Sequence, residues 1–580
     1  MTASRIVLVA GAAATLSACS FIEPTSLPLV APQVTATMQV KQLTLRWPSV
    51  DNAEWYRIVA APDGEQLTQV GDDLDGDATS VAIPIAAHRI QWMTTRYRVE
   101  ACHSDACVSS ADLAIEDLML GSIGTLSAAA GDLGDGFGIV ALSGDGQTLV
   151  IGAPYEDSAA SGINSDQTNN SLDSAGAVYI YTRDGGTWAQ QFYIKPSNPQ
   201  PASYFGLGLA ISNDGTVLAV GAVGESSNAT GIDGAQDNTL ATGSGATYVF
   251  RKTAATWTQE AYIKASNAEA RDYFGEGVAL SGDGNTLAVS ALGEGSATNG
   301  VNGDQADNGA AAAGAVYVFR STAGTWTQQA YVKASNSEPE DYFGASVALS
   351  DDGNTLAVGA DQEASLSSSQ DDNGGYGAGA VYVFARSGEA WVHQAYLKAA
   401  APEEQDGFGR AVALSNGGDR LVIGAPGEDS NATGVTTIGD PFIIPNNNAP
   451  EAGAVYVFVR TAGVWSPDCY VKPSNPASSS GFGNSVALAG DGALFAVGAI
   501  GENGGSLGIN GSQIAGPAPV GAVYTFERSD DSWAQQAYVK GPTVEDHDTM
   551  GFRISLSDDG DALAASAPMR AENTGVTFLY

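Results

Sequence analysis

The feature that most constrains the fold is a Phe-Gly motif that recurs along most of the chain at nearly constant spacing. Successive copies lie 68, 69, 69, 65, 74 and 68 residues apart. The copies begin at Phe137, Phe205, Phe274, Phe343, Phe408, Phe482 and, with Met in place of Phe, Met550. Self-similarity at a fixed period indicates one supersecondary unit copied many times, with each copy packed against its neighbours.

Each repeat contains four segments with the character of β-strands. A typical copy reads "YFGASVALSDDGNTLAVGA", then a polar loop, then "GAVYVFARSGEAWVHQAYLK". Asp-Gly pairs, as at Asp283-Gly284 and Asp352-Gly353, predict tight hairpins between the first two strands. The third strand, "AVYVF", is apolar on both alternating faces, so both faces of the sheet must be covered. Seven such sheets predict an all-β fold, a seven-bladed β-propeller over residues 118–580.

The two ends of the repeat array predict how the ring closes. The last repeat stops at Tyr580 after three strands, which leaves one edge of its sheet without a partner. Before the first Phe-Gly, "LGSIGTLSAAAGDLGDGFG" occupies the slot that an outer strand fills elsewhere. We therefore expect residues 123–128 to supply the outer strand of the last blade.

The paired motifs Phe-Gly and Gly-Ala-Pro resemble those of FG-GAP repeats, the units of the integrin α-subunit propeller. Gly-Ala-Pro stands at Gly152–Pro154 and Gly424–Pro426, and Ser566–Pro568 is a variant of it. The resemblance implies a propeller with a binding role. Repeats of that family often hold calcium between their first two strands, but here this connection is only four residues, as at Ser350–Gly353. The chain also has no Arg-Gly-Asp and no D-x-S-x-S adhesion motif.

The acidic residues concentrate instead in the long loops between the second and third strands. These loops and those that lead into each Phe-Gly should emerge at one end of the ring, where exposed loops usually bind partners. Two interpretations remain open: carboxylates and carbonyls that ligate calcium, or solvated turns, since Asp and Asn also form turns. The candidate ligands are Asp166, Asp233, Asp237, Asp304 and Asp307.

The N-terminus resembles a bacterial lipoprotein leader. An apolar run is followed by Leu-Ser-Ala-Cys, which predicts a signal peptide at residues 1–19 and lipidation of Cys19. An ordinary cleaved signal peptide is the alternative. Residues 20–33 contain three prolines and form a tether. We expect a lipid-anchored envelope protein, in the outer membrane by the sorting rule for Ser20, at the surface or facing the periplasm.

Residues 34–117 contain short alternating segments that predict a small β-sandwich. Trp47, Tyr56 and Tyr97 stand where a fibronectin type III domain places its aromatic residues, so this segment resembles that family. The resemblance implies a spacer or an adhesive module. Cys102 and Cys107 flank a predicted hairpin turn and should form a disulfide in an exported protein. A metal site with His103 is the alternative, although it lacks a fourth ligand.

The composition and the absence of certain motifs reduce the range of possible functions. The chain has 65 acidic and 25 basic residues, a formal charge of −40 that would repel nucleic acid. It contains no H-E-x-x-H motif and no Walker loop. We expect a monomeric, non-catalytic adhesion or recognition protein for an extracellular or envelope protein or glycan. The membrane contact would be through the lipid alone, and calcium is the one candidate cofactor. The alternatives are a structural component of the periplasm and a polysaccharide-active enzyme with paired carboxylates in the propeller mouth.

Overall fold

The computed structural model describes residues 29–61, 66–89, 91–104, 106–129, 131–370, 372–437 and 446–580. The predicted leader, Cys19 and most of the tether lie outside the described residues, as do the side chains of Gln91 and Trp92. Among the described residues, no helix is long and apolar enough to cross a membrane. By contact density the chain forms two compact units. One contains Leu45–Val81 and Arg96–Leu113, and the other contains Ala114–Tyr580 with Ala36–Thr44 and Ala82–Thr95.

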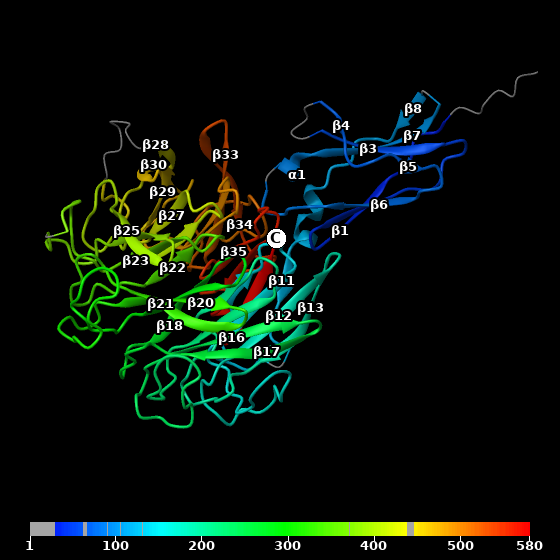
Figure 1. Ribbon diagram of the computed structural model, residues 1–580. Coiled ribbons are helices and arrows are strands. Elements are labelled where there is room, and N and C mark those ends of the chain that lie inside the picture. The colour runs from blue at the N-terminus through cyan, green and yellow to red at the C-terminus, as the bar shows by residue number, and fades with distance from the viewer. Residues whose placement is uncertain are drawn as a thin grey trace, which may run out of the picture. The chain divides into compact units, whose positions relative to one another are not determined.

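The N-terminal strands form two antiparallel sheets (Figure 1). In the first unit, Trp47 and Tyr56 pack with ring centroids 5.3 Å apart, and Tyr97 and Val99 are buried. The assignment to the fibronectin type III family stays a prediction. One sheet has the order β1 (Thr35–Gln39), β2 (Gln42–Arg46), β6 (Ser80–Pro84). The other has the order β4 (Thr68–Gln69), β3 (Trp55–Ala61), β7 (Arg96–His103), β8 (Ala106–Ser109), with β5 (Leu74–Asp75) also on β3. The short segment α1 (Gln91–Thr94) lies between β6 and β7, and η2 (Glu116–Ser122) follows β8.

The rest of the described chain forms seven antiparallel sheets, and the Phe-Gly motif opens the inner strand of each or lies just before it. The first three sheets are β10 (Ile139–Leu142), β11 (Thr148–Ala153), β12 (Ala177–Asp184), β13 (Thr187–Ile194); β14 (Leu209–Ile211), β15 (Val217–Ala222), β16 (Ala246–Thr253), β17 (Thr256–Ile263); and β18 (Phe274–Leu280), β19 (Thr286–Ala291), β20 (Ala315–Thr322), β21 (Thr325–Val332).

The remaining sheets repeat the pattern, with a fifth strand, β28, in one of them. They are β22 (Ser346–Leu349), β23 (Thr355–Ala360), β24 (Ala380–Ser387), β25 (Ala390–Leu397); β26 (Ala411–Leu414), β27 (Arg420–Ala425), β29 (Ala454–Thr461), β30 (Val464–Lys472), β28 (Gly434–Thr437); β31 (Phe482–Leu488), β32 (Leu494–Ala499), β33 (Ala522–Ser529), β34 (Ser532–Val539); and β35 (Ile554–Leu556), β36 (Leu563–Ala567), β37 (Val576–Leu579), β9 (Gly124–Leu126). A short turn, α2 (Arg570–Asn573), precedes β37.

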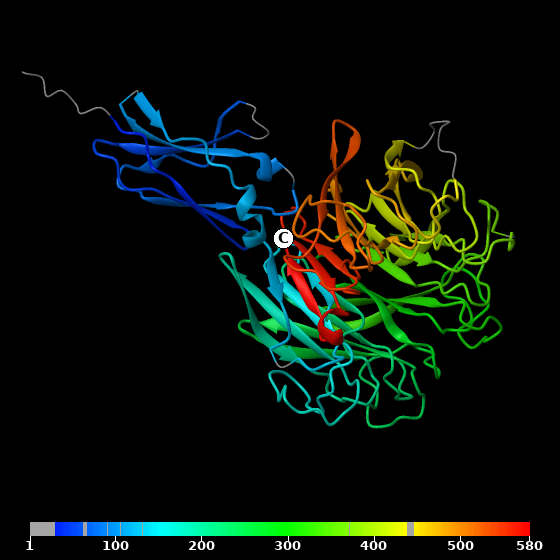
Figure 2. The ribbon, with the colours of Figure 1, turned by 180° about the vertical axis from the view of Figure 1, so that it is seen from behind.

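The ring closes as the sequence predicts, because β9 pairs with β37 as the outer strand of the last sheet. Leu126 lies opposite Thr577, and Gly124 opposite Leu579. In both views the C-terminal strands, in red, lie beside the cyan strands of the first sheet (Figures 1 and 2). The expected outer strand at residues 123–128 is therefore confirmed, and strands from both ends of the array share one sheet.

A second set of hydrogen bonds closes the ring at the turns between the first two strands of each sheet. There, backbone N–H groups donate to carbonyls of the next sheet in a closed series, which we call the axial belt. Its seven bonds, 2.8–3.1 Å long, are Asp145→Asn213, Asn213→Gly282, Gly282→Asp351, Asp351→Asn416, Asn416→Gly490, Gly490→Asp558 and Asp558→Gly144. The amide of Asn213 also donates to Asp351 (2.8 Å) and Asp558 (2.9 Å), two and five sheets further along the chain. These three side chains therefore meet near the axis.

The outer-strand tryptophans pack between neighbouring sheets. Trp326 is buried in a core that includes Val217 and Ala219 of the preceding sheet, and its Nε1 donates to Glu260 there (2.8 Å). Trp391 and Trp465 make the equivalent bond to glutamines of the preceding sheet. Cys469 is buried in the same kind of core, and burial raises the pKa of its thiol, so the thiol is unreactive at neutral pH.

Candidate binding face

One end of the propeller carries all the long loops. Alternation of the strands places the loops before the third strand and the loops before Phe-Gly at the same end, and hydrogen bonds join the two sets. The Arg271 N–H donates to the Thr242 carbonyl (2.9 Å), and the Ala202 N–H donates to that of Asp173 (2.8 Å). In the part of the chain that the structure describes, the opposite end carries the short turns between strands, including those of the axial belt, and His88 contacts the carbonyl of Gly560 in one of these turns (2.7 Å). We call the first end the loop face.

A buried ion pair fastens each of six long loops to the outer strand of its own sheet. A glutamate at the start of the loop meets a lysine at the end of that strand, and both side chains are buried. Burial lowers the pKa of every one of these lysines, for example Lys264. The pairs are Glu156–Lys195, Glu225–Lys264, Glu294–Lys333, Glu363–Lys398, Glu428–Lys472 and Glu502–Lys540, at 2.5–2.9 Å. The loop face is therefore built on fixed anchor points.

Two of the calcium candidates, Asp166 and Asp304, hold their own turns. The Asp166 carboxylate accepts hydrogen bonds from the backbone and hydroxyl of Thr168, at 2.9 and 2.8 Å, and the backbone bond is the main cause of its lowered pKa. Asp304 accepts from the Ala306 N–H (3.0 Å). Both are turns in which an Asp side chain caps the residue two positions on.

The other three candidates also lie apart. Asp233 has a left-handed backbone (φ 53°) and accepts from the Tyr262 N–H (3.0 Å), a bond that Asn makes in three other sheets. Asp307 accepts from Ala297 and Gly309, and Asp237 is exposed. Within the described part of the chain, no three carboxylates from these loops converge on one point. Calcium binding at these positions stays a prediction that the geometry does not support.

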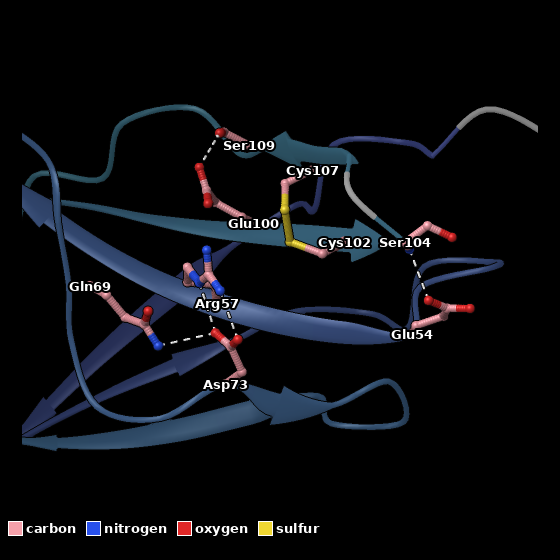
Figure 3. Close-up of a disulfide and its surroundings, with 9 residues drawn as sticks. All are labelled: Glu54, Arg57, Gln69, Asp73, Glu100, Cys102, Ser104, Cys107 and Ser109. Carbon is pink, nitrogen blue, oxygen red and sulfur yellow. Dashed lines mark hydrogen bonds and ion pairs between the residues drawn. A yellow bond between two sulfur atoms is a disulfide. The ribbon is translucent and has the colours of Figure 1, made fainter.

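Three potential metal ligands do come together, in the N-terminal unit. Glu100, Cys102 and Cys107 bring their ligand atoms within 4.8 Å of one another. However, Cys102 and Cys107 form a disulfide of 2.08 Å between strands β7 and β8 (Figure 3). Glu100 accepts instead from Ser109 (2.9 Å), and His103 faces Glu54 at 3.7 Å. A disulfide has no thiolate to offer a metal, so the alternative of a cysteine–histidine metal site is wrong for this oxidised state.

A polar cavity of about 210 Å³ lies where the inner strands converge. Its lining includes the charged side chains of Glu276, Arg410 and Arg553. Arg410 lies 3.5 Å from Asp361, whereas Arg553 bonds the carbonyl of Phe552 (3.2 Å). Burial lowers the pKa of Arg553 to about 10, and the charge of Arg410 adds to this effect. Motif analysis missed these residues because none of them recurs from one repeat to the next.

Several carboxyl groups beside the Phe-Gly motifs have pKa values near neutrality. Burial raises the pKa of Asp135 to about 6 and those of Asp272, Asp341 and Asp406 to about 7. Each accepts a backbone N–H three residues earlier, as Asp272 does from Glu269 (2.7 Å). These groups are buried and hold the loops in place. They are therefore unsuited to act on a substrate, despite pKa values that would suit an acid–base pair.

One sequence pattern typical of hydrolases lies in a long loop. Gly504–Gly508 spells G-x-S-x-G around Ser506. The nucleophile elbow of such enzymes is a sharp turn from a strand into a helix that exposes the serine. Here the segment lies in the loop between β32 and β33, and the Ser506 hydroxyl is buried. The geometry does not match a nucleophile elbow.

Comparison with known proteins agrees with the repeats. Three stretches, residues 257–319, 326–384 and 391–458, match the model of the FG-GAP repeat family. These stretches are similar to FG-GAP repeats, and their strands belong to the sheets of a β-propeller. Each matched stretch begins at an outer-strand tryptophan, so it spans the outer strand of one sheet and the first three strands of the next, with the extra strand β28 included in the third stretch. No curated protein matches the chain significantly.

Several solved structures resemble the chain. The WD40 repeats of RRP9 share 11% identity over 79% of this chain and 96% of that one, with a TM-score of 0.40. The Dos1 propeller shares 13% sequence identity over 78% of this chain and 93% of that one, with a TM-score of 0.37. The tricorn protease shares 9% sequence identity over 95% of this chain but only 42% of its own length, with a TM-score of 0.38. Because these values are low, the fold assignment rests on the sheet topology and the repeats.

Proposed function

We propose that the protein is a non-catalytic recognition protein of the bacterial envelope, which binds a protein or glycan partner with the loop face of a seven-bladed propeller. The asymmetry of the ring supports this proposal. Six long loops are fastened by buried ion pairs at one end, and hydrogen-bonded short turns close the other. Loops on a rigid scaffold keep their binding geometry without a large ordering cost.

The proposal includes the anchor that the leader predicts. Lipid at Cys19, the tether at residues 20–33 and a fibronectin type III-like spacer at 34–117 would hold the propeller away from the membrane. Palmitate labelling that disappears in Cys19→Ala would support the anchor. Protease treatment of intact cells then tests orientation: a cleaved protein faces outward, and a protected one indicates a role in the periplasm instead.

The binding role is tested with purified protein that begins at residue 29. One variant carries Asp237→Ser and Asp304→Ser, two exposed positions on the loop face, and the control carries Asp530→Ser and Asp531→Ser in an exposed turn at the opposite end. Both variants lose the same charge. We expect weaker binding to isolated cell envelopes for the loop-face variant alone. Equal binding by both variants and the unaltered protein would contradict a loop-face site.

A further inference from the structure

The residue directly before each Phe-Gly motif, or before the Met-Gly copy, has a left-handed backbone in all seven sheets. The φ values lie between 52° and 66°. Three sheets place Gly there and one places Thr, but three consecutive sheets place Tyr. The residues are Gly136, Tyr204, Tyr273, Tyr342, Gly407, Gly481 and Thr549. Gly adopts this conformation freely, whereas a residue with a Cβ is strained in it. The three tyrosines are therefore kept at positions where the backbone favours glycine.

These tyrosines form an arc on the loop face. Tyr204, Tyr273 and Tyr342 are spaced by 69 residues and occupy equivalent places in neighbouring sheets. Tyr273 is 41% exposed, and the other two are half-buried. Loop tyrosines extend the arc at both ends: Tyr155 (48% exposed) has its ring centroid 5.7 Å from that of Tyr204, and Tyr376 (54% exposed) lies in the long loop of the sheet that Tyr342 opens.

The glycine at the equivalent position in the first sheet shows how the arc is built. A Cβ on Gly136 would lie 2.8 Å from Cδ2 of Tyr155, so Tyr155 covers the place where a side chain at Gly136 would stand. Among the described residues, no tyrosine lies within 4 Å of the Cβ position of Gly407 or Gly481. A hollow lined by Pro426, Glu451 and Ile500 lies beside Gly481 instead. The exposed tyrosines of the described residues beside these positions therefore lie in the first four sheets of the ring.

We infer that this tyrosine arc, Tyr155, Tyr204, Tyr273, Tyr342 and Tyr376, is a binding surface for a neutral glycan chain. The inference rests on the proposed function and names its ligand class. Equivalent aromatic rings at a regular interval suit a ligand made of equivalent rings, because tyrosine packs its face on apolar C–H groups and keeps its hydroxyl free for hydrogen bonds. The formal charge of −40 works against polyanionic glycans.

Substitution by glycine separates binding from folding at these positions. Tyr204→Gly, Tyr273→Gly and Tyr342→Gly restore the residue that other sheets of the same chain use. The triple variant should therefore keep or raise Tm, because strain is relieved. The alternative is that the tyrosines only pack against the loops. Cε1 of Tyr273, for example, lies 3.3 Å from the place where a Cβ on Gly243 would stand. In that case the triple variant will have a lower Tm.

The experiment uses protein beginning at residue 29 on an array of neutral and acidic glycans, followed by calorimetry with the hexasaccharide of the best neutral ligand. We expect each Tyr→Gly change to weaken binding by about five- to tenfold. Tyr→Phe at the same positions should retain most of the affinity, and Thr549→Gly, the matched position without tyrosine, should retain all of it.

The outcomes separate this inference from the proposed function. No binding to any neutral glycan overturns the inference, and so does neutral-glycan binding that the triple variant leaves unchanged. In either case the proposed function survives if the loop-face variant still loses binding to cell envelopes. If that loss is also absent, the proposed function fails as well.

Discussion

At the scale of single residues, the most consequential contacts are the buried pairs between glutamate and lysine. Glu225 and Lys264 are both buried, at 2.7 Å, and Lys264 also donates to Ser244. Glu225→Ala leaves a buried ammonium without its counter-charge, which costs about 3–5 kcal/mol. Denaturant unfolding should show this loss, and Glu225→Leu with Lys264→Met should recover much of it.

The control is the ion pair of Arg528 and Asp531, where the Asp side chain is 89% accessible. Asp531→Ala should change stability by less than about 1 kcal/mol, because water already solvates the Asp531 carboxylate. A similar loss in both variants would mean that the buried pair does not fasten the loop.

The buried aspartates predict how stability depends on pH. Burial raises the pKa of Asp341 to about 7 in the folded protein, with Glu363 and Glu338 adding to the effect. The ordinary value for an unfolded chain is near 4. The folded state therefore holds a proton that the unfolded state has released, and the stabilisation from this proton is lost as pH rises from about 4 to 7.

In the unaltered protein the Asp341 carboxyl group accepts a hydrogen bond from the Glu338 N–H (3.0 Å). Asp341→Asn removes the titrating proton, and the amide oxygen of the new side chain can still accept this bond. We expect Tm to fall less between pH 5 and pH 8 in the variant than in the unaltered protein. Thermal melts at fixed ionic strength measure this difference. Parallel curves would show that Asp341 does not titrate in this range.

Sequence patterns located the acidic loops but not the roles of their residues. The glutamate that follows the second strand, as in "GAPYEDS" and "GAPGEDS", recurs as regularly as Phe-Gly, and so does the lysine that ends the outer strand. The pairing was missed because partners 35–44 residues apart meet only after the sheet forms. The residue types alone did not distinguish the turns of Asp166 and Asp304 from calcium loops, because a capping turn and a calcium loop use the same residue types.

At the scale of elements, the outer strand β9 decides whether the last sheet is complete. Replacing residues 118–130 by a Gly/Ser segment of equal length removes the partner of β37 and exposes its edge. Tm should fall by several degrees. A control that keeps Ile123–Leu126 and replaces only the flanking residues should lose much less stability, because it removes side-chain contacts such as those of Met119 and Ala128 but keeps the strand. Equal melting of all three proteins would exclude a closing role for β9.

The positions of the strands were predictable because each strand has a local signal in the sequence. Residue types alternate along the inner strand, apolar residues fill the next two strands, and a tryptophan marks the outer strand. The fifth strand, β28, was not predicted. Its sequence, "GVTT", lies in a polar loop and pairs with β30 through backbone bonds that any residues can make. Strand addition of this kind depends on the neighbouring edge and leaves little trace in the sequence.

At the scale of the whole molecule, the axial belt should make the ring unfold as a unit. Gly282 lies in the belt, and a Cβ there would stand 2.3 Å from Oδ1 of Asp351 and 2.9 Å from Nδ2 of Asn213. Gly282→Ala must therefore displace the side chains that meet near the axis, at a cost of about 1–3 kcal/mol. Gly417 directly follows the belt residue Asn416 in the equivalent turn of another sheet, and the nearest neighbour of its Cβ position is 3.4 Å away, so Gly417→Ala is a control outside the belt.

Because strands from both ends of the array share one sheet and the belt links every sheet to the next, no sheet of the ring is terminal. An open array can fray from its ends, whereas a closed ring must break two sheet interfaces before any sheet leaves. We therefore expect Gly282→Ala to lower Tm while the propeller still melts in one transition in calorimetry, and Gly417→Ala to have no effect. Separate transitions for different sheets would show that the belt does not couple them.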